Sequence, residues 1–312
     1  MEKIGGQGSK TRLDSQIYST ELGSAHAGDA LDLVHDIQNE SINLILTSPP
    51  FALTRKKEYG NFSADEYVSW FMKFAYDFHR VLKKDGSFIL DLGGAYLPGF
   101  PVRTIYQFEL LIRLYKETGF FLAQEFFHYN PARLPSPTEW VNVRRIRVKD
   151  SVNVVWWLSK STNPKADNRK VLKPYGESMK QLLKNGYKAK LRPSGHDISV
   201  NFSKNNNGAI PSNLISLANT ESNSSYLRLC KQNGIKPHPA RFPAGFPKFF
   251  IEFLTDENDV VLDPFAGSNT TGWMAERLNR RWLAFDLNRE YLLASKFRFE
   301  NDLFQPLEEN IP

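Results

Sequence analysis

Short apolar runs alternate with longer amphipathic segments along most of the chain, a pattern typical of a mostly parallel sheet covered by helices. The apolar runs predict strands at Ile42–Thr47, Ser87–Leu92, Phe121–His128, Val152–Leu158, Val260–Asp263 and Trp282–Phe285, with a seventh, short strand before Gly28. The amphipathic segments predict helices at Ala30–Ile37, Ala64–Leu82, Thr104–Thr118, Phe246–Thr255, Asn269–Leu278 and Arg289–Phe304. We therefore predict an α/β fold built on a seven-stranded, mostly parallel sheet.

This alternation stops between about residues 161 and 230, where basic residues are followed by stretches rich in Asn and Ser such as NFSKNNNGAIPSN. Such composition predicts an irregular inserted lobe that stays outside the sheet. Because candidate functional motifs lie on both sides of it, residues 1–160 and 231–312 are expected to form one catalytic domain. The lobe, residues 161–230, is expected to carry target recognition.

Charge and composition narrow the function. Residues 141–204 hold 15 Lys and Arg against 4 Asp and Glu, a local charge of +11 in a chain whose total is +6. Such a run is equally consistent with a solvated face or with a phosphate-binding surface. Cys230 is the single cysteine, no apolar run is long enough to span a membrane, and the N-terminus lacks a signal-peptide pattern. We expect a cytoplasmic protein without a metal site.

The strongest motif is Val260-Val-Leu-Asp-Pro-Phe-Ala-Gly-Ser-Asn-Thr-Thr-Gly272, a strand, a turn of small residues and a helix start. Ligands of open α/β sheets lie at such strand ends, and the free N–H groups of a helix start favour a carboxylate or phosphate. Asp286 ends the next strand, where it can accept both hydroxyls of a ribose or instead cap the following helix. No dinucleotide or Walker motif occurs, which favours S-adenosylmethionine.

A second motif, Ser48-Pro49-Pro50-Phe51, ends a buried strand. The prolines stiffen the turn and lack N–H groups, which leaves carbonyls and the Ser48 hydroxyl as acceptors. Such acceptors can bind both hydrogens of an aromatic amine and direct its lone pair towards a methyl donor. Phe51 would stack on the base, which must first leave the duplex. Pro-Pro also ends strands for purely structural reasons, and only the pairing with the first motif favours catalysis.

Asp91 lies near the end of the strand Ser87–Leu92, beside the expected position of Ser48. It could orient the Ser48 hydroxyl or receive a proton through it, or it could only hold the Gly93-Gly94 turn. Methylation at cytosine C5 is excluded more firmly, because it requires a cysteine nucleophile and Cys230 lies far from both motifs.

The motif around Asp263 resembles the D-P-F-x-G-S-x-T-T signature of amino-directed DNA methyltransferases. The resemblance implies the Rossmann-like S-adenosylmethionine-dependent methyltransferase fold. It implies that Asp263 orients the cofactor, that Asp29 contacts its adenine amino group besides its possible role as a helix cap, and that further residues line the cofactor site. Those lining the methionine end would be Phe265, Gly267, Ser268, Thr270 and Thr271; His238, Arg241 and Phe242 of the HPARFP segment would be further contacts.

The order of parts, target motif first, lobe second and cofactor motif last, resembles the permuted β class of these enzymes. Strings such as TSPPFALTRKKEYGN, LPSPTEWVN and RPSGHDI are similar to type II modification methylases that make N4-methylcytosine in CAGCTG. In this family, Ser-Pro-Pro-aromatic is commoner in cytosine-N4 enzymes and Asp-Pro-Pro-Tyr in adenine-N6 enzymes. The resemblance implies double-stranded DNA as substrate and a restriction endonuclease as a genetic partner only.

The candidate DNA contacts are basic or polar residues of the positively charged region, namely Arg144, Arg145, Lys188, Lys190, Arg192, Ser194 and His196. A monomer suffices, because a palindromic site offers each strand in a separate encounter. Two alternatives remain open. One is an adenine-N6 DNA methyltransferase, and the other is a catalytically inactive DNA-binding regulator on the same fold, which would have no need for both motifs.

Overall fold

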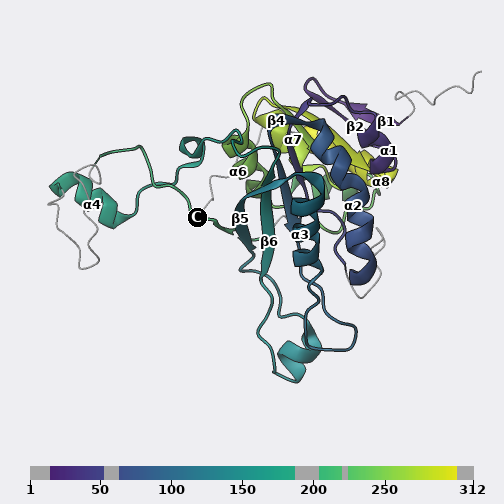
Figure 1. Ribbon diagram of the computed structural model, residues 1–312, viewed down its shortest axis with the longest axis horizontal. Helices are drawn as coiled ribbons and strands as arrows, with labels where there is room; N and C mark the ends of the chain where they lie inside the picture. Colours follow the sequence, from purple (N-terminus) through teal and green to yellow (C-terminus); the bar gives the residue numbers. More distant parts are fainter. Residues whose placement is uncertain (1–14, 53–62, 187–203, 220–223, 301–312) are drawn as a thin grey trace, which may run out of the picture.

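One sheet organises the molecule in the computed structural model, which describes residues 15–52, 63–186, 204–219 and 224–300. Within these residues the sheet has nine strands in the order β1-β2-β9-β8-β3-β4-β6-β5-β7 (Figure 1). The central strands from β2 to β4 are parallel, whereas β6 runs antiparallel to both β4 and β5. The predicted α/β class with a mostly parallel sheet is confirmed.

The strands follow the predicted apolar runs closely. They are β1 Gln16–Ser19, β2 Gly23–Ala27, β3 Ile42–Thr47, β4 Leu82–Leu92, β5 Phe121–Tyr129, β6 Val152–Ser159, β7 Leu214–Ser216, β8 Val260–Asp263 and β9 Arg281–Asp286. The strand count differs from the predicted seven because β1 and β7 were not predicted. Both are short edge strands of four and three residues, too short to show an alternating pattern.

Helices cover both faces of the sheet. They are α1 Ala30–His35, α2 Ala64–Val81, α3 Tyr106–Thr118, α4 Glu177–Asn185, α5 Ser225–Gln232, α6 Gly245–Leu254, α7 Thr270–Arg277, α8 Arg289–Ser295 and α9 Phe297–Glu300. Side chains from α1, α2 and α3 form the core on one face, and side chains from α6, α7 and α8 form the core on the other. No helix among the described residues is both long and apolar enough to span a membrane.

The central strands supply both cores because successive side chains point to opposite faces. In β4, Phe88 and Leu90 pack with α2 and α3, whereas Ile89 between them packs in the core on the other face. In β6, Trp156 packs in the core with α2 and α3, and Trp157 packs in the core on the other face. This double burial explains why these strands read as continuous apolar runs in the sequence.

The segment 161–230 is not irregular throughout. Its strand β7 pairs in parallel with β5 at the sheet edge, which corrects the expectation that the whole segment stays outside the sheet. Its helix α5 packs against α8 and α9 through Tyr226 and Cys230. Whether the remainder acts as a target-recognition lobe stays a proposal.

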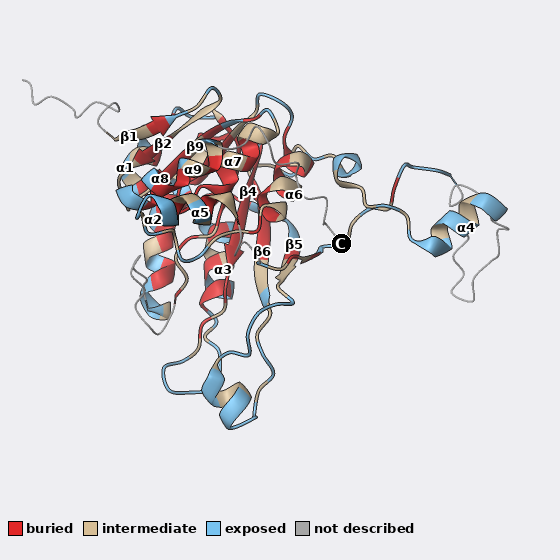
Figure 2. Cartoon of the chain, turned by 180° about the vertical axis from the view of Figure 1, so that it is seen from behind, coloured by how far each residue is buried: buried red, intermediate tan, exposed pale blue. Residues whose placement is uncertain are grey.

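Two projections leave the body (Figure 1). One carries α4, on a stalk where Lys173 and Ala209 pair as an isolated antiparallel bridge. The other, which we call the β5–β6 projection, is the connection of residues 130–151 and contains the π-helical turn Glu139–Val143. Most of its residues are exposed, in contrast to the buried strands of the body (Figure 2).

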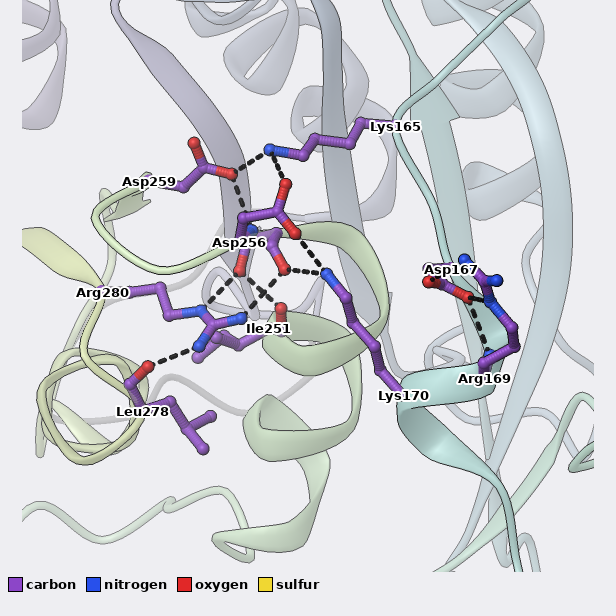
Figure 3. Close-up of polar contacts among 10 residues, drawn as sticks. Lys165, Asp167, Arg169, Lys170, Ile251, Asp256, Asp259, Leu278 and Arg280 are labelled. Atoms are coloured by element: carbon purple, nitrogen blue, oxygen red, sulfur yellow. Dashed lines mark hydrogen bonds and ion pairs between the residues drawn. The ribbon is translucent and has the colours of Figure 1, made fainter. Parts of the chain in front are cut away.

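Ion pairs fix the start of the segment 161–230 to the catalytic body (Figure 3). Lys165 Nζ lies 2.6 Å from Asp259 Oδ2 and 2.5 Å from Asp256 Oδ2, and Lys170 also pairs with Asp256. Arg280 braces the same corner by donating to the Thr255 carbonyl at 2.9 Å. The stalk that leads to α4 therefore starts from a fixed point beside β8.

Candidate active site

A cavity of about 850 Å³ lies at the carboxyl ends of β3, β4, β8 and β9. This is the edge at which open α/β sheets bind ligands. Its lining includes fifteen residues predicted from the two motifs and their neighbours, namely Asp29, Ser48, Pro49, Pro50, Phe51, Asp91, His238, Arg241, Phe242, Asp263, Phe265, Gly267, Ser268, Thr270 and Asp286. The fold thus brings into one cavity two motifs that lie more than 200 residues apart in the chain.

Asp263, the last residue of β8, is buried and ties three elements together. Its Oδ1 accepts from Thr47 Oγ1 at 2.7 Å and from the Phe265 N–H at 3.1 Å, and its Oδ2 accepts from Thr271 Oγ1 at 2.8 Å. Burial raises the pKa of Asp263 to about 6, and these hydrogen bonds oppose the shift. Asp263 therefore shapes the turn. Thr271 faces it and does not line the cavity.

The turn after β8 brings backbone close to the cavity at Gly267. This residue has a φ of +51°, which strains any residue with a side chain, and a Cβ there would make a tight contact of 3.0 Å with the His238 ring. The Gly267 N–H donates to Asp286 Oδ2 at 2.8 Å, and the Asn288 N–H donates to Asp286 Oδ1 at 2.8 Å. Burial raises the pKa of Asp286.

Two acidic residues had alternative roles as helix caps. The cap of α8 is Asn288, whose side chain accepts from the N–H groups of Glu290 and Tyr291, so Asp286 is not that cap. Asp29 does cap α1, accepting from the Leu31 N–H at 2.9 Å, and it also lines the cavity. Asp286 lines the cavity as well.

Aromatic rings form the wall beside the turn. Phe265 packs edge-on against Phe74 at 5.2 Å between ring centroids and lies 5.7 Å from Trp70, both on α2. On the opposite side, the Phe242 ring stacks on Phe246 at 4.7 Å. His238 packs edge-on against Tyr291 at 4.5 Å. Phe265, Phe242 and His238 all line the cavity and give it apolar surface.

The target half contains a chain of hydrogen bonds that starts at Ser48. Ser48 Oγ donates to Asp91 Oδ2 at 3.0 Å, and Asn153 Nδ2 donates to the same oxygen at 3.4 Å. Asp91 is 2% exposed, and its burial raises the pKa of its carboxyl group. Among the described residues, Asp91 Oδ1 has no hydrogen-bond partner, and His128 Nδ1 lies 4.0 Å from it.

Phe51 owes its position to a glycine. A Cβ on Gly93 would lie 2.5 Å from the Phe51 ring, so the ring rests directly on this backbone. Gly93 follows β4, two residues after Asp91, and its carbonyl accepts from the Tyr106 hydroxyl. The Gly93-Gly94 turn therefore supports Phe51, a role the sequence did not reveal.

The two predicted DNA contacts that the structure describes do not line the cavity. Arg144 and Arg145 are exposed on the β5–β6 projection. The other five, Lys188, Lys190, Arg192, Ser194 and His196, lie outside the described residues.

Several lining residues were missed by sequence reasoning, notably His128, Asn130, Arg133, Asn153 and Asn219. The first four lie where β5 ends and β6 begins, at the same sheet edge as Asp91. Only the antiparallel pairing of β6 places them there, and the sequence had indicated parallel strands. Alternating polar residues in HYN and VNV were the available signal.

A cradle for S-adenosylmethionine is present in the cavity: a close glycine backbone, a buried carboxylate and facing aromatic rings. Ser48 and Pro49, the predicted acceptors for an amino group, line the same cavity. These features define an amine-directed methyltransferase of Rossmann-like fold.

Comparison with known proteins places the chain within that class. Residues 42–297 match the family model N6_N4_Mtase, described as DNA methylase. The Type II methyltransferase M.PvuII of Proteus hauseri is 56% identical over 285 residues, covering 90% of this chain and 85% of the relative. The chain belongs to this family of DNA methylases.

A solved structure and a more distant relative are also DNA methyltransferases by name. A structure described as PvuII DNA methyltransferase (cytosine-N4-specific) matches with a TM-score of 0.76 and 48% identity, over 93% of this chain and 91% of that one. The DNA adenine methyltransferase YhdJ of Escherichia coli (strain K12) is 24% identical over 91% of this chain and 84% of its own length. The family therefore contains relatives named for each of the two amino-group targets.

Proposed function

We propose that this DNA methyltransferase transfers a methyl group from S-adenosylmethionine to N4 of a cytosine flipped out of duplex DNA, within the sequence CAGCTG. The observation that carries the proposal is the hydrogen bond from Ser48 Oγ to Asp91 Oδ2 inside the cofactor cavity. Because the hydroxyl hydrogen points at Asp91, the oxygen lone pairs of Ser48 are left to accept from the amino group being methylated.

The cofactor occupies the half of the cavity built by β8, β9 and α1. The Asp286 carboxylate accepts the ribose hydroxyls, Asp29 accepts from the adenine amino group, and the backbone of Gly267 and Ser268 borders the methionine end. When bound, the cofactor supplies a methyl group on a positively charged sulfur. Asp263 holds the turn through its three hydrogen bonds.

The flipped cytosine occupies the other half. Its amino hydrogens bond to Ser48 Oγ and the Pro49 carbonyl, which directs the nitrogen lone pair at the methyl group, and Phe51 stacks on the ring. On transfer, the methyl group would leave the cofactor sulfur, which keeps the electron pair of the broken S–C bond, and would bond to the amino nitrogen. The nitrogen would then release one proton to Ser48 Oγ, while Ser48 passes its own hydrogen to Asp91 Oδ2. The raised pKa of Asp91 suits it to receive that proton.

The positively charged segment supplies DNA affinity. Arg144 and Arg145 on the β5–β6 projection contact phosphates, as do the basic residues of the predicted lobe, residues 161–230. The enzyme acts as a monomer in the cytoplasm. It belongs to a restriction-modification system in which the endonuclease is a genetic partner and not a bound subunit. The name "Type II methyltransferase" of a relative 56% identical supports this role.

Adenine N6 is the second candidate target, favoured by the likeness to a DNA adenine methyltransferase. Serine in place of aspartate at position 48 supports cytosine, as does the cytosine-N4-specific description of a structure 48% identical. An inactive DNA-binding regulator would need neither the Ser48–Asp91 hydrogen bond nor the Gly267 turn.

Nucleoside analysis tests the proposal. Duplex DNA containing CAGCTG is incubated with enzyme and cofactor labelled in the methyl group, digested to nucleosides and separated. We expect label in N4-methylcytosine and protection from a nuclease that cuts CAGCTG. Label in N6-methyladenine would overturn the cytosine assignment, and absence of label would support the regulator. Label outside CAGCTG would overturn only the site.

A further inference from the structure

Arg103, in the loop between β4 and α3, lies against the turn that supports Phe51. A Cβ on Gly94 would overlap Arg103 Nη2, so the guanidinium rests directly on the Gly94 backbone. The backbone of Arg103 pairs with Tyr96 in an antiparallel bridge, which fixes the loop. The neighbouring residue, Gly93, contacts the Phe51 ring. The guanidinium therefore lies beside the target half of the cavity.

Two further arginines lie nearby on the β5–β6 projection. Arg133 lines the cavity and donates from Nη1 to Asn153 Oδ1 at 3.1 Å. Arg147 lies over the Tyr96 ring at 4.9 Å and donates to the Pro101 carbonyl at 2.5 Å. Tyr96 also packs against Trp140, so the loop and the projection form one wall.

Arg103 and Arg133 both have a lowered pKa. Desolvation lowers the pKa of Arg103, and repulsion from Arg147 adds to the effect. Desolvation likewise lowers the pKa of Arg133, where attraction to Asp91 opposes it and repulsion from Arg103 reinforces it. Each guanidinium thus lies within the field of another of the same sign.

Counter-charge is scarce in this wall. Asp150 lies 3.7 Å from Arg147 and accepts from the Tyr96 hydroxyl, while Asp91 is hydrogen-bonded to Ser48 and Asn153. In the described part of the chain, Arg103 forms neither an ion pair nor a side-chain hydrogen bond. An exposed cation near like charges and without a carboxylate partner is suited to an anion supplied from outside.

We propose that Arg103 binds the backbone phosphate of DNA next to the flipped target nucleotide. The planar guanidinium matches two phosphate oxygens, and its position beside Phe51 places that phosphate where the strand must turn to deliver the base. This contact holds the nucleotide outside the duplex and offsets part of the cost of flipping. The proposal rests on the proposed function, since it requires a flipped base in the cavity.

The test combines a protein variant with a neutral DNA linkage. Arg103→Ala is compared with Arg113→Ala, which removes the same charge from an exposed ion pair with Glu117 on α3. The probe is a CAGCTG duplex with a methylphosphonate at either phosphate flanking the target cytosine. We expect Arg103→Ala to weaken binding about 10-fold and to lower the salt slope by about 0.9. Arg113→Ala should change neither.

The decisive comparison is the double change. The methylphosphonate at one flanking position should weaken binding by wild-type enzyme about 10-fold and should not weaken Arg103→Ala further. Arg103→Lys keeps the positive charge but lacks the planar guanidinium group. Its affinity for the unmodified duplex should lie between those of wild-type enzyme and Arg103→Ala. Additive losses at both flanking positions would overturn the proposal. Since the neutral linkage leaves wild-type protein intact, its effect on wild-type binding does not depend on how well the variant folds.

Failure of this proposal is distinguishable from failure of the proposed function. Wild-type enzyme that makes N4-methylcytosine, together with additive losses at both phosphates, overturns only the role of Arg103. If Arg103→Ala no longer discriminated between CAGCTG and sites altered at a guanine, Arg103 would read a base edge. That result would also overturn the phosphate contact. Nucleoside analysis of wild-type product answers the other question separately.

Discussion

The two halves of the cavity differ in how completely their polar groups are hydrogen-bonded within the protein. In the cofactor half, Asp263 accepts three hydrogen bonds and Asp286 accepts two from backbone N–H groups. In the target half, Asp91 Oδ1 accepts none from the described residues, although the side chain is 2% exposed. Both halves are buried, yet Asp263 and Asp286 use both carboxylate oxygens in hydrogen bonds within the described residues, whereas Asp91 uses only Oδ2.

The difference follows from what each half must do. A rigid turn suits the binding of a cofactor, and hydrogen-bonded buried carboxylates supply rigidity. A group that takes up a proton must change its hydrogen bonding during the reaction. An unsatisfied buried oxygen is costly to the fold, and we expect the one on Asp91, beside Ser48, to serve the proposed proton transfer.

Asp91→Asn should cause the largest loss. The amide cannot take the proton that Ser48 passes on, so kcat should fall by about 10³-fold, while the affinity for S-adenosylmethionine stays as in wild type. Because burial raises the pKa of Asp91 above 3.8, wild-type kcat should rise with pH through that raised pKa as the carboxylate forms. In Asp91→Asn, this rise of kcat with pH should be absent. If the rise persisted unchanged, it would reflect the titration of another group.

Ser48→Ala should lower kcat by about 10²-fold, because one acceptor for the reacting amine is removed where the hydrogen bond is strongest near the transition state. Steady-state kinetics at saturating cofactor measure it, and calorimetry should show unchanged cofactor binding. If Ser48 and Asp91 act as a unit, Ser48→Ala/Asp91→Asn should cost little more than Asp91→Asn alone. Fully additive losses would mean that the two residues act independently.

Asp286→Ala should produce the opposite pattern. Loss of hydrogen bonds to a charged acceptor should weaken cofactor binding by about 10-fold to 100-fold, and kcat at saturating cofactor should remain near wild type. Calorimetric titration gives the affinity directly. Asp286→Asn, which retains an oxygen for the Gly267 N–H, separates a weakened hold on the ligand from collapse of the turn. A lower kcat with unchanged affinity would reverse the assignment of the two halves.

The two halves of the cavity also differ in how well they could be predicted from the sequence. The cofactor half is built from local segments, so the strand Val260–Asp263, its turn and Asp286 were predicted within a residue or two. The target half depends on pairing between distant strands. Asn153 and Arg133 reach the cavity only because β6 runs antiparallel between β4 and β5, and register of that kind leaves no local signature.

The support of Phe51 was hidden for a related reason. Glycine pairs usually mark a turn, and nothing in Gly93-Gly94 indicates that one residue carries a phenyl ring and the other a guanidinium. Close approach of a side chain to a glycine depends on the tertiary structure. The edge strand β7 was missed because three residues cannot show a period.

The smallest expected effect tests whether the exposed projection contributes to either half. Arg144→Ala/Arg145→Ala should lower the slope of log affinity against log salt by up to about 1.8, about 0.9 for each phosphate that the variant no longer neutralises. The change should be equal for CAGCTG and random duplexes, because phosphate contacts carry no sequence information. The control Arg113→Ala/Lys296→Ala removes two charges that are already paired with Glu117 and Glu300. Equal slopes in both double variants would mean that Arg144 and Arg145 only solubilise the projection, whereas a change confined to CAGCTG would mean that they read bases.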